Sequence, residues 1–208
     1  MDRRGSGPTV KKSSDNIEEE LLASANEKVS KIKIASLNAY NLISSKKHKV
    51  KQLEALLREE NIKILCIQET WMKDEILDAE IHIDEFRTYR QDRGGTRKGG
   101  GVVTYVDTGL TVTQEESFTN GVCDVIYTEI EELNIGVINI CCPPSSDKDS
   151  FNEILQKVRE WTSQTQREII LLGDLIFKSM NAWTESDKDG LREDIVEKRK
   201  TQWGRELT

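Results

Sequence analysis

Two apolar segments of the sequence each end in a carboxylate. Residues 63–69 are KILCIQE and residues 168–174 are EIILLGD. Nearly continuous runs of Ile, Leu and Cys are typical of strands that are buried on both faces. An acid at the end of such a strand lies where the sheet opens to solvent, and acids held there are often metal ligands or proton-transfer groups. Glu69 and Asp174 are therefore candidate functional residues, unless each only caps a helix or a turn.

The segments around these acids alternate between strand and helix patterns. Apolar residues at helical spacing predict helices over 45–60 and 150–162. Strand patterns at close spacing, typical of antiparallel strands, follow the glycine-rich segment 94–101. The expected strands are 31–37, 63–69, 86–90, 101–107, 110–116, 122–130, 134–141 and 168–174. Two weaker helices are predicted, one over 17–30 that begins after Asn16 and one over 190–199.

Length and charge set the broad class of protein. The chain has 208 residues and 36% hydrophobic content, which suits one packed domain and an appendage. A net charge of -7 excludes a generic polyanion binder, so an approach to nucleic acid would need a local basic face or a bound cation. We expect a disordered lead and a short helix in residues 1–30, the domain in 31–180, and a polar tail with a weak helix in 181–208.

The four cysteines are Cys66, Cys123, Cys141 and Cys142. They show neither CxxC nor Cys/His ligand spacing, so the sequence predicts no zinc site and no disulfide framework. Reduced thiols in an intracellular protein, nuclear or cytoplasmic, are the simpler interpretation. No apolar stretch approaches the ~20 residues needed to cross a bilayer, so no membrane association is expected.

Five short motifs occur in a fixed order: SLN at 36–38, QETW at 68–71, YRQDR followed by GGGVVTYV at 89–106, INICCPPSS at 138–146, and LLGD at 171–174. This order resembles the endonuclease/exonuclease/phosphatase superfamily, and the details are most similar to the endonuclease domains of LINE-type (non-LTR) retrotransposons. The resemblance covers roughly residues 31–180. It implies an α/β (α+β) fold in which two sheets form a β-sandwich flanked by helices.

The resemblance also implies roles for three residues. Glu69 matches the glutamate that binds Mg²⁺ (Mn²⁺ being the alternative), and Asn38 matches the asparagine that supports this metal site. Asp174 matches the aspartate that orients and activates the attacking water. Oxygen ligands are those that Mg²⁺ prefers, and an ionised aspartate can accept a proton from water. From its own sequence context, Asn38 is equally well explained as a turn residue that ends its strand.

The sequence departs from the family pattern at positions that handle the phosphate. The position two residues after Asp174 is usually asparagine, and here it is Ile176, which can donate no hydrogen bond. A tyrosine usually precedes the xPP segment, and here that residue is Cys141. The family ends in an Asp-His pair, whereas this chain has histidine only at 48 and 82. Because such groups act as a unit, we expect weak or no activity and a weakly held cation.

The resemblance further implies a sandwich that is truncated at its carboxyl-terminal side. The second half of the family domain completes the second sheet, so we expect an incomplete second half with an open edge after the strand that ends at Asp174. A partner chain that supplies the missing strands would cover that edge.

Basic residues near the glycine-rich segment suggest contact with a DNA backbone, chiefly through Arg93, Arg97 and Lys98. Charged faces are more often simply solvated, and several acids lie close by in the sequence.

The sequence therefore predicts a hydrolase-family domain of retrotransposon origin, with a Mg²⁺-dependent phosphodiesterase or DNA endonuclease chemistry and an associated reverse transcriptase. It leaves open whether the polypeptide is an active enzyme. The alternatives are a catalytically dead module that binds nucleic acid or protein, and a pseudogene-like product without a selected function.

Overall fold

The alternating elements expected from the sequence form two four-stranded sheets. The computed structural model describes residues 32–43, 49–94 and 99–175, so the helices predicted at 17–30 and 190–199 lie outside the described residues. In chain order the elements are β1 Lys33–Asn38, α2 Lys49–Glu59, β2 Ile62–Gln68, the 3₁₀ turn η1 Asp78–Glu80, β3 Phe86–Gln91, β4 Val102–Asp107, β5 Val112–Thr119, β6 Asp124–Ile130, β7 Ile135–Cys142, α3 Lys148–Thr162 and β8 Glu168–Leu175.

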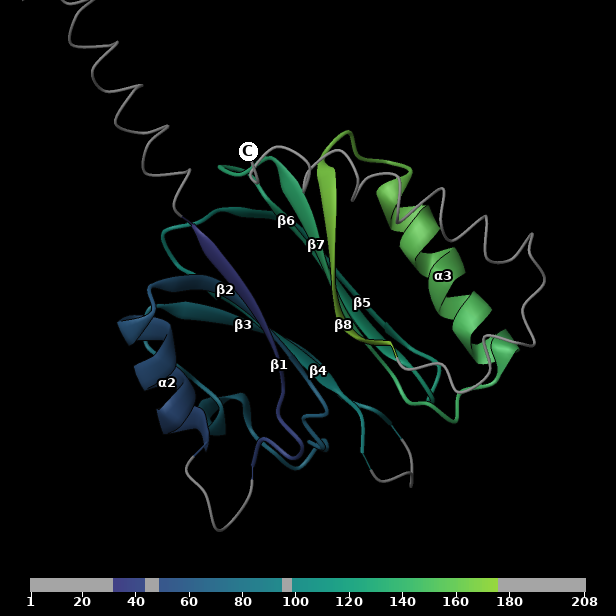
Figure 1. Ribbon diagram of the computed structural model, residues 1–208, viewed down its shortest axis with the longest axis horizontal. Coiled ribbons are helices and arrows are strands. Elements are labelled where there is room, and N and C mark those ends of the chain that lie inside the picture. The colour runs from purple at the N-terminus through teal and green to yellow at the C-terminus, as the bar shows by residue number, and fades with distance from the viewer. Residues whose placement is uncertain (1–31, 44–48, 95–98, 176–208) are drawn as a thin grey trace, which may run out of the picture. The chain divides into compact units, whose positions relative to one another are not determined.

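The two sheets pack face to face, as the predicted sandwich requires. Their strand orders are β1-β2-β4-β3 and β5-β6-β7-β8. The pairs β1–β2 and β7–β8 are parallel, and the remaining pairs are antiparallel. Helix α2 covers the outer face of the first sheet and α3 covers the outer face of the second (Figure 1). The predicted fold class, a two-sheet sandwich flanked by helices, is confirmed.

Each helix is held on its sheet by one apolar face. Leu53 and Leu57 of α2 are buried in a cluster with residues of the first sheet. Phe151, Ile154 and Trp161 of α3 pack in the same way against the second sheet. None of the helices in the described part of the chain is long and apolar enough to cross a membrane.

The two strands associated with the candidate acids, β2 before Glu69 and β8 with Asp174, differ in burial. Strand β2 is almost fully buried, as the apolar sequence of residues 63–69 predicts. Strand β8, which was also expected to be buried on both faces, has half-buried side chains over residues 169–172. The reason is its place at the edge of the sheet, where no described strand pairs with its second side.

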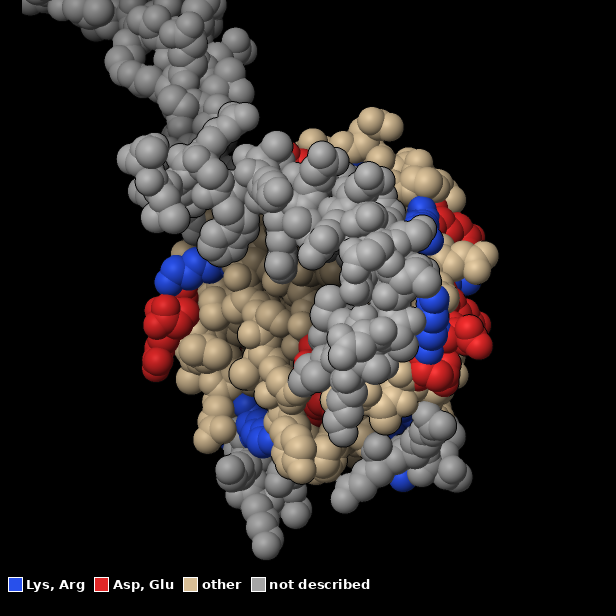
Figure 2. Space-filling view, turned by 45° about the vertical axis from the view of Figure 1, so that its right-hand side comes forward, with Lys and Arg blue, Asp and Glu red and all other residues tan. Residues whose placement is uncertain are grey.

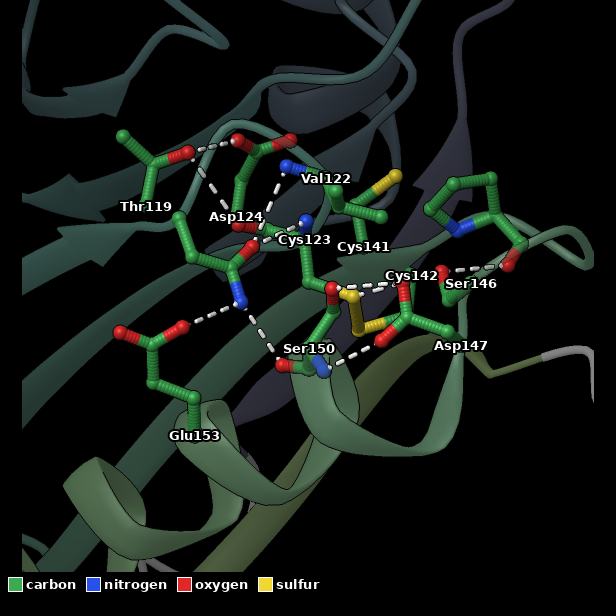
Figure 3. Close-up of a disulfide and its surroundings, with 12 residues drawn as sticks. Thr119, Val122, Cys123, Asp124, Cys141, Cys142, Ser146, Asp147, Ser150 and Glu153 are labelled. Carbon is green, nitrogen blue, oxygen red and sulfur yellow. Dashed lines mark hydrogen bonds between the residues drawn. A yellow bond between two sulfur atoms is a disulfide. The ribbon is translucent and has the colours of Figure 1, made fainter.

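A disulfide between Cys123 and Cys142 corrects the expectation of four reduced cysteines (Figure 3). The two cysteines lie opposite each other at the end of the β6–β7 pair, one step beyond the partners Asp124 and Cys141. Their Cα atoms are 4.5 Å apart, the usual spacing of a non-hydrogen-bonded antiparallel pair and short enough for a disulfide. Cys66 and Cys141 remain free and buried.

Candidate active site

Asn38 and Asp174 meet where the edge strands of the two sheets end. Asn38 is the last residue of β1, and its Nδ2 donates to Asp174 Oδ2 of β8 at 2.8 Å. Asn38 Oδ1 also accepts from the backbone N–H of Tyr40 at 3.1 Å. The Asn38 side chain thus shapes the turn after β1 and also contacts Asp174, the candidate water-activating aspartate.

Glu69 follows β2, the parallel neighbour of β1, and its carboxylate is fixed by three donors. Oε2 accepts from Trp71 Nε1 at 2.6 Å and from the backbone N–H of Gly100 at 3.1 Å. Oε1 accepts from Cys141 Sγ at 3.2 Å. Partial burial alone would raise the pKa of Glu69, but these hydrogen bonds and the charge of Arg93 outweigh it, so the pKa of Glu69 is lowered. The carboxylate is thus ionised and held in one orientation.

Cys141 lies beside both acids, since it donates a hydrogen bond to Glu69 and is the strand partner of Asp174. Cys141 and Asp174 are paired residues on the parallel strands β7 and β8, so their side chains project from the same face of the sheet. Burial and the neighbouring Glu69 carboxylate raise the pKa of the Cys141 thiol, which keeps the proton that it donates to Glu69. Cys142 points to the opposite face, toward α3 (Figure 3). Cys141 thus faces the candidate site and Cys142 faces α3, as the alternation of side chains along a strand requires.

The glycine-rich turn is held against Glu69 by a buried ion pair. Arg93 Nε and Nη2 donate to Asp124 Oδ2 at 3.0 and 2.7 Å, and the same oxygen accepts from the Gly101 N–H at 2.8 Å. The Arg93 guanidinium lies so close to Gly100 that a Cβ there would be 2.0 Å from Cζ. Gly100 has a φ of +81°, so both space and conformation require glycine. The turn can therefore present its N–H to Glu69.

This placement of Arg93 corrects the prediction that it contacts nucleic acid. Its side chain is 5% exposed and is paired with Asp124, which is fully buried. A guanidinium desolvated in this way is not available to a phosphate backbone. Arg97 and Lys98, the other two predicted contacts, lie outside the described residues.

The remaining basic side chains near the turn also have protein partners. Arg90 pairs with Asp78 and Asp92, and Arg87 donates to the carbonyls of Thr108 and Leu110. On the face shown in Figure 2, blue side chains lie beside red ones and form no continuous basic surface among the described residues. The described chain therefore shows no dedicated polyanion surface at this face.

Strained backbone is concentrated at the candidate site. Non-glycine residues with positive φ include Tyr40 at 44°, Asn41 at 74°, Glu69 at 54° and Trp71 at 55°. These four residues belong to the two loops that follow β1 and β2. Such conformations cost of the order of 1–3 kcal/mol each and are found most often at functional sites.

The donors present suit a hard cation that is held by few protein ligands. Glu69, Asn38 and Asp174 offer oxygen ligands, and Oε1 of Glu69 accepts one hydrogen bond from the described residues, which leaves it a lone pair. Among the described residues, no group of three or more His, Cys, Asp or Glu side chains is arranged to hold a metal ion. These donors are compatible with a hard divalent cation that is bound through one carboxylate and keeps most of its waters.

Two contributors to the site were not predicted from the sequence. Trp71 belongs to the QETW motif, which assigns it no role, and Asp124 lies within an expected strand. The available signal for Asp124 is an acid between apolar residues near the start of the segment 122–130, because such an acid needs a partner when it is buried. Its partner Arg93 lies 31 residues earlier in the chain, and no local pattern indicates the pairing.

A family model described as the Endonuclease/Exonuclease/phosphatase family matches residues 35–175, more than half of the chain. The chain belongs to the endonuclease/exonuclease/phosphatase family. A comparison with curated protein sequences found no match.

Solved structures with a similar fold include phosphatases and nucleases. A mannosyl-6-phosphatase from Bacteroides thetaiotaomicron aligns with a TM-score of 0.52 and 15% identity, over 69% of this chain and 64% of that protein. The AP endonuclease LMAP from Leishmania major aligns with a TM-score of 0.52 and 17% identity, over 81% and 60%. The endonuclease domain of TRAS1, a telomere-specific non-LTR retrotransposon, gives a TM-score of 0.49 and 15% identity, over 80% and 70%. The chain thus spans less than two thirds of the first two proteins, and these similarities define its fold only.

Proposed function

We propose that this domain acts on phosphodiester bonds of DNA with the help of Mg²⁺, and that the 208-residue polypeptide cleaves them weakly or not at all. The observation that supports the site best is the direct hydrogen bond between Asn38 and Asp174, which joins residues 136 positions apart at the ends of two edge strands. Neither residue is needed there to fill the core, since Asn38 is exposed and Asp174 is only half-buried.

The proposed roles come from the family resemblance, and the contacts of the side chains support them. Asp174 would accept a proton from the attacking water, and the hydrogen bond from the Asn38 amide would hold it in orientation. Glu69, ionised and fixed by three donors, is the ligand for the cation. Bound Mg²⁺ would supply positive charge to the phosphoryl oxygens.

Weak activity is proposed because donors to the phosphate are missing from the sequence. Ile176 stands where the family resemblance expects an amide, and the two histidines of the chain are at 48 and 82. His82 lies on the surface beside Asp84. Loss of one preorganised donor typically costs about 10²–10³ in rate. Loss of an amide and an imidazole together would reduce cleavage to the background.

The test is nicking of supercoiled plasmid in Mg²⁺ and in EDTA. We expect little nicking by the unmodified chain and little gain from Ile176→Asn alone. A chain that carries Ile176→Asn and a grafted family segment with the Asp-His pair should nick the plasmid. Glu69→Ala should abolish that activity, whereas Glu59→Ala, an exposed acid on α2, should not.

Two results would contradict the proposal in different ways. Robust nicking that persists in EDTA would refute the role of a cation. Nicking by the unmodified chain that requires both Mg²⁺ and Glu69 would support the site and refute the proposed loss of activity.

We further propose that the domain derives from a non-LTR retrotransposon. The support is the sequence itself, since YRQDR…GGGVVTYV, CCPPSS and LLGDLIFKSM resemble the corresponding segments of those elements. A partner chain that adds strands beside β8 is part of the same proposal, because β8 has an open edge within the described sheet.

A binding module without catalysis is the second candidate function. The missing phosphate donors favour it, because contact with a nucleic acid does not require them. Plasmid binding without nicking, even after the graft, would identify this alternative.

A further inference from the structure

An aromatic pair, Tyr40 and Trp71, lies beside the candidate active site, and the Tyr40 ring has no role in the chemistry described above. The ring centroids of Tyr40 and Trp71 are 4.5 Å apart, with planes tilted by 53°. Tyr40 is 70% exposed, the highest value among the exposed large hydrophobic residues of the described chain. Large aromatic rings contribute most to stability when they are buried, so an ordered ring exposed to this extent calls for another explanation.

Hydrogen bonds from the Lys49 side chain and from the backbone hold the loop that carries Tyr40 in place. Lys49 Nζ donates to three consecutive carbonyls, those of Ala39, Tyr40 and Asn41, at 2.6, 2.9 and 2.7 Å. The backbone N–H groups of Ala39, Asn41 and Leu42 donate to the carbonyls of Gln68, Glu69 and Thr70. Leu42 is buried and anchors the loop in the core. A ring on such a loop loses little conformational freedom when it binds a ligand.

Tyr40, through its backbone, and Trp71, through its ring, each donate a hydrogen bond to a residue of the candidate active site. Asn38 Oδ1 accepts from the Tyr40 N–H at 3.1 Å, and Glu69 Oε2 accepts from Trp71 Nε1 at 2.6 Å. Tyr40 and Trp71 also both have positive φ, a strained conformation for bulky residues. These strained backbone conformations thus place Tyr40 and Trp71 beside the Asn38 amide and the Glu69 carboxylate.

We propose that Tyr40, supported by its contact with Trp71, stacks on a nucleobase next to the phosphodiester group. This inference rests on the proposed function. A base is the part of a nucleic acid that offers a flat π-face, and base–aromatic stacking tolerates any sequence. The tilted contact with Trp71 leaves most of the Tyr40 ring available to a ligand. The subsite would therefore give affinity for unpaired or splayed bases without reading their identity.

The test compares two single-stranded ligands of equal length and equal phosphate number, measured by fluorescence anisotropy in Mg²⁺. One ligand carries bases, including 2-aminopurine, and the other is built from abasic tetrahydrofuran nucleotides. Stacking of one base is worth about 1–3 kcal/mol, so the unmodified chain should bind the base-bearing ligand ~5–100-fold more tightly. Tyr40→Ala should remove this preference, and Tyr40→Phe should keep it.

A matched control and a second readout separate stacking from general damage. Leu77→Ala removes another exposed apolar side chain, 66% exposed and on a different loop, and should leave the preference unchanged. The fluorescence of 2-aminopurine should fall on binding to the unmodified chain and not to Tyr40→Ala. Unfolding transitions should be the same for all variants, because Tyr40 is exposed.

Each other result overturns the proposal in a recognisable way. Equal binding of both ligands by the unmodified chain would show contact with sugar and phosphate only, which refutes the base subsite and leaves the proposed function standing. A preference that survives Tyr40→Ala would place the base contact elsewhere. Binding of neither ligand would refute the subsite together with the proposed nucleic-acid function.

Discussion

At the scale of single residues, the site depends on how Glu69 is surrounded rather than on Glu69 alone. Its three donors come from three segments: the indole of the following loop, the glycine-rich turn, and the thiol of Cys141 on the other sheet. Each of these donors favours the ionised carboxylate. Cys141 also shows how a departure from the family pattern is accommodated, since a thiol with a raised pKa still donates a hydrogen bond.

Glu69→Gln tests this arrangement through the pH dependence of stability. Because the pKa of Glu69 is lowered on folding, ionised Glu69 stabilises the folded state above its unfolded pKa of about 4.3, and this contribution is lost as the pH falls through the lower folded value. The difference in free energy of unfolding between the unmodified chain and Glu69→Gln should therefore shrink as the pH falls from about 5 to about 3. The measurement is urea unfolding at several pH values.

Glu60→Gln is the control for that experiment. The side chain of Glu60 is 57% exposed and pairs with the exposed Lys33, so its substitution should change the free energy of unfolding by less than about 1 kcal/mol. A difference for Glu69→Gln that stays constant from about pH 5 to about pH 3 would show that its carboxylate has no lowered pKa.

At the scale of elements, most strands and both described helices could be predicted because their patterns are local. The apolar spacing of 150–162 predicts α3, which begins at Lys148 after the Asp147 cap, and the short strand candidate 86–90 forms β3. Strand burial was predicted correctly for β2 and incorrectly for β8, because an apolar sequence does not reveal which strand ends a sheet.

The disulfide could not be predicted for a similar reason. Cys123 and Cys142 are 19 residues apart and come together only because the β6–β7 register pairs Asp124 with Cys141. Other registers of the same two strands would have left both thiols free. The cross-link therefore fixes the register that also directs Asp124 toward Arg93 and Cys141 toward Glu69.

Thiol counting and reduction test the Cys123–Cys142 disulfide. The oxidised protein, unfolded without reductant, should expose two reactive thiols, Cys66 and Cys141, and reduction should raise the count to all four cysteines. Reduction should lower the free energy of unfolding by about 2–4 kcal/mol, because the cross-link restricts the unfolded chain. A variant with Cys123→Ala and Cys142→Ala should be insensitive to reductant. Four reactive thiols in the unreduced protein would contradict the assignment.

At the scale of the whole described domain, the two sheets are joined by a buried polar bridge. Asn139 of β7 accepts from Gln68 Nε2 at 2.7 Å, and its Nδ2 donates to the Val103 carbonyl at 2.9 Å and to Thr104 Oγ1 at 3.2 Å. Asn139 is fully buried and Gln68 is 2% exposed. The sequence order predicts a sandwich, but it cannot predict this contact, which depends on how one sheet is placed over the other.

Such a bridge favours one placement of the sheets, because any slip would leave buried amides without partners. Asp174 and Glu69 belong to different sheets, so the same placement brings the two halves of the candidate site together. The bridge therefore connects the packing of the sandwich with the geometry of the site.

Asn139→Ala should lower the free energy of unfolding by about 2–4 kcal/mol, because it leaves the buried Gln68 amide without its acceptor and opens a cavity. Asn152→Ala, the same substitution at an exposed position of α3, should change it by less than about 0.5 kcal/mol. Replacing Gln68 and Asn139 together by leucine should recover part of the loss, since no unpaired amide then remains in the interface. Urea unfolding followed by tryptophan fluorescence measures all of these variants. If Asn139→Ala unfolds like Asn152→Ala, the sheets are held in place by apolar packing alone.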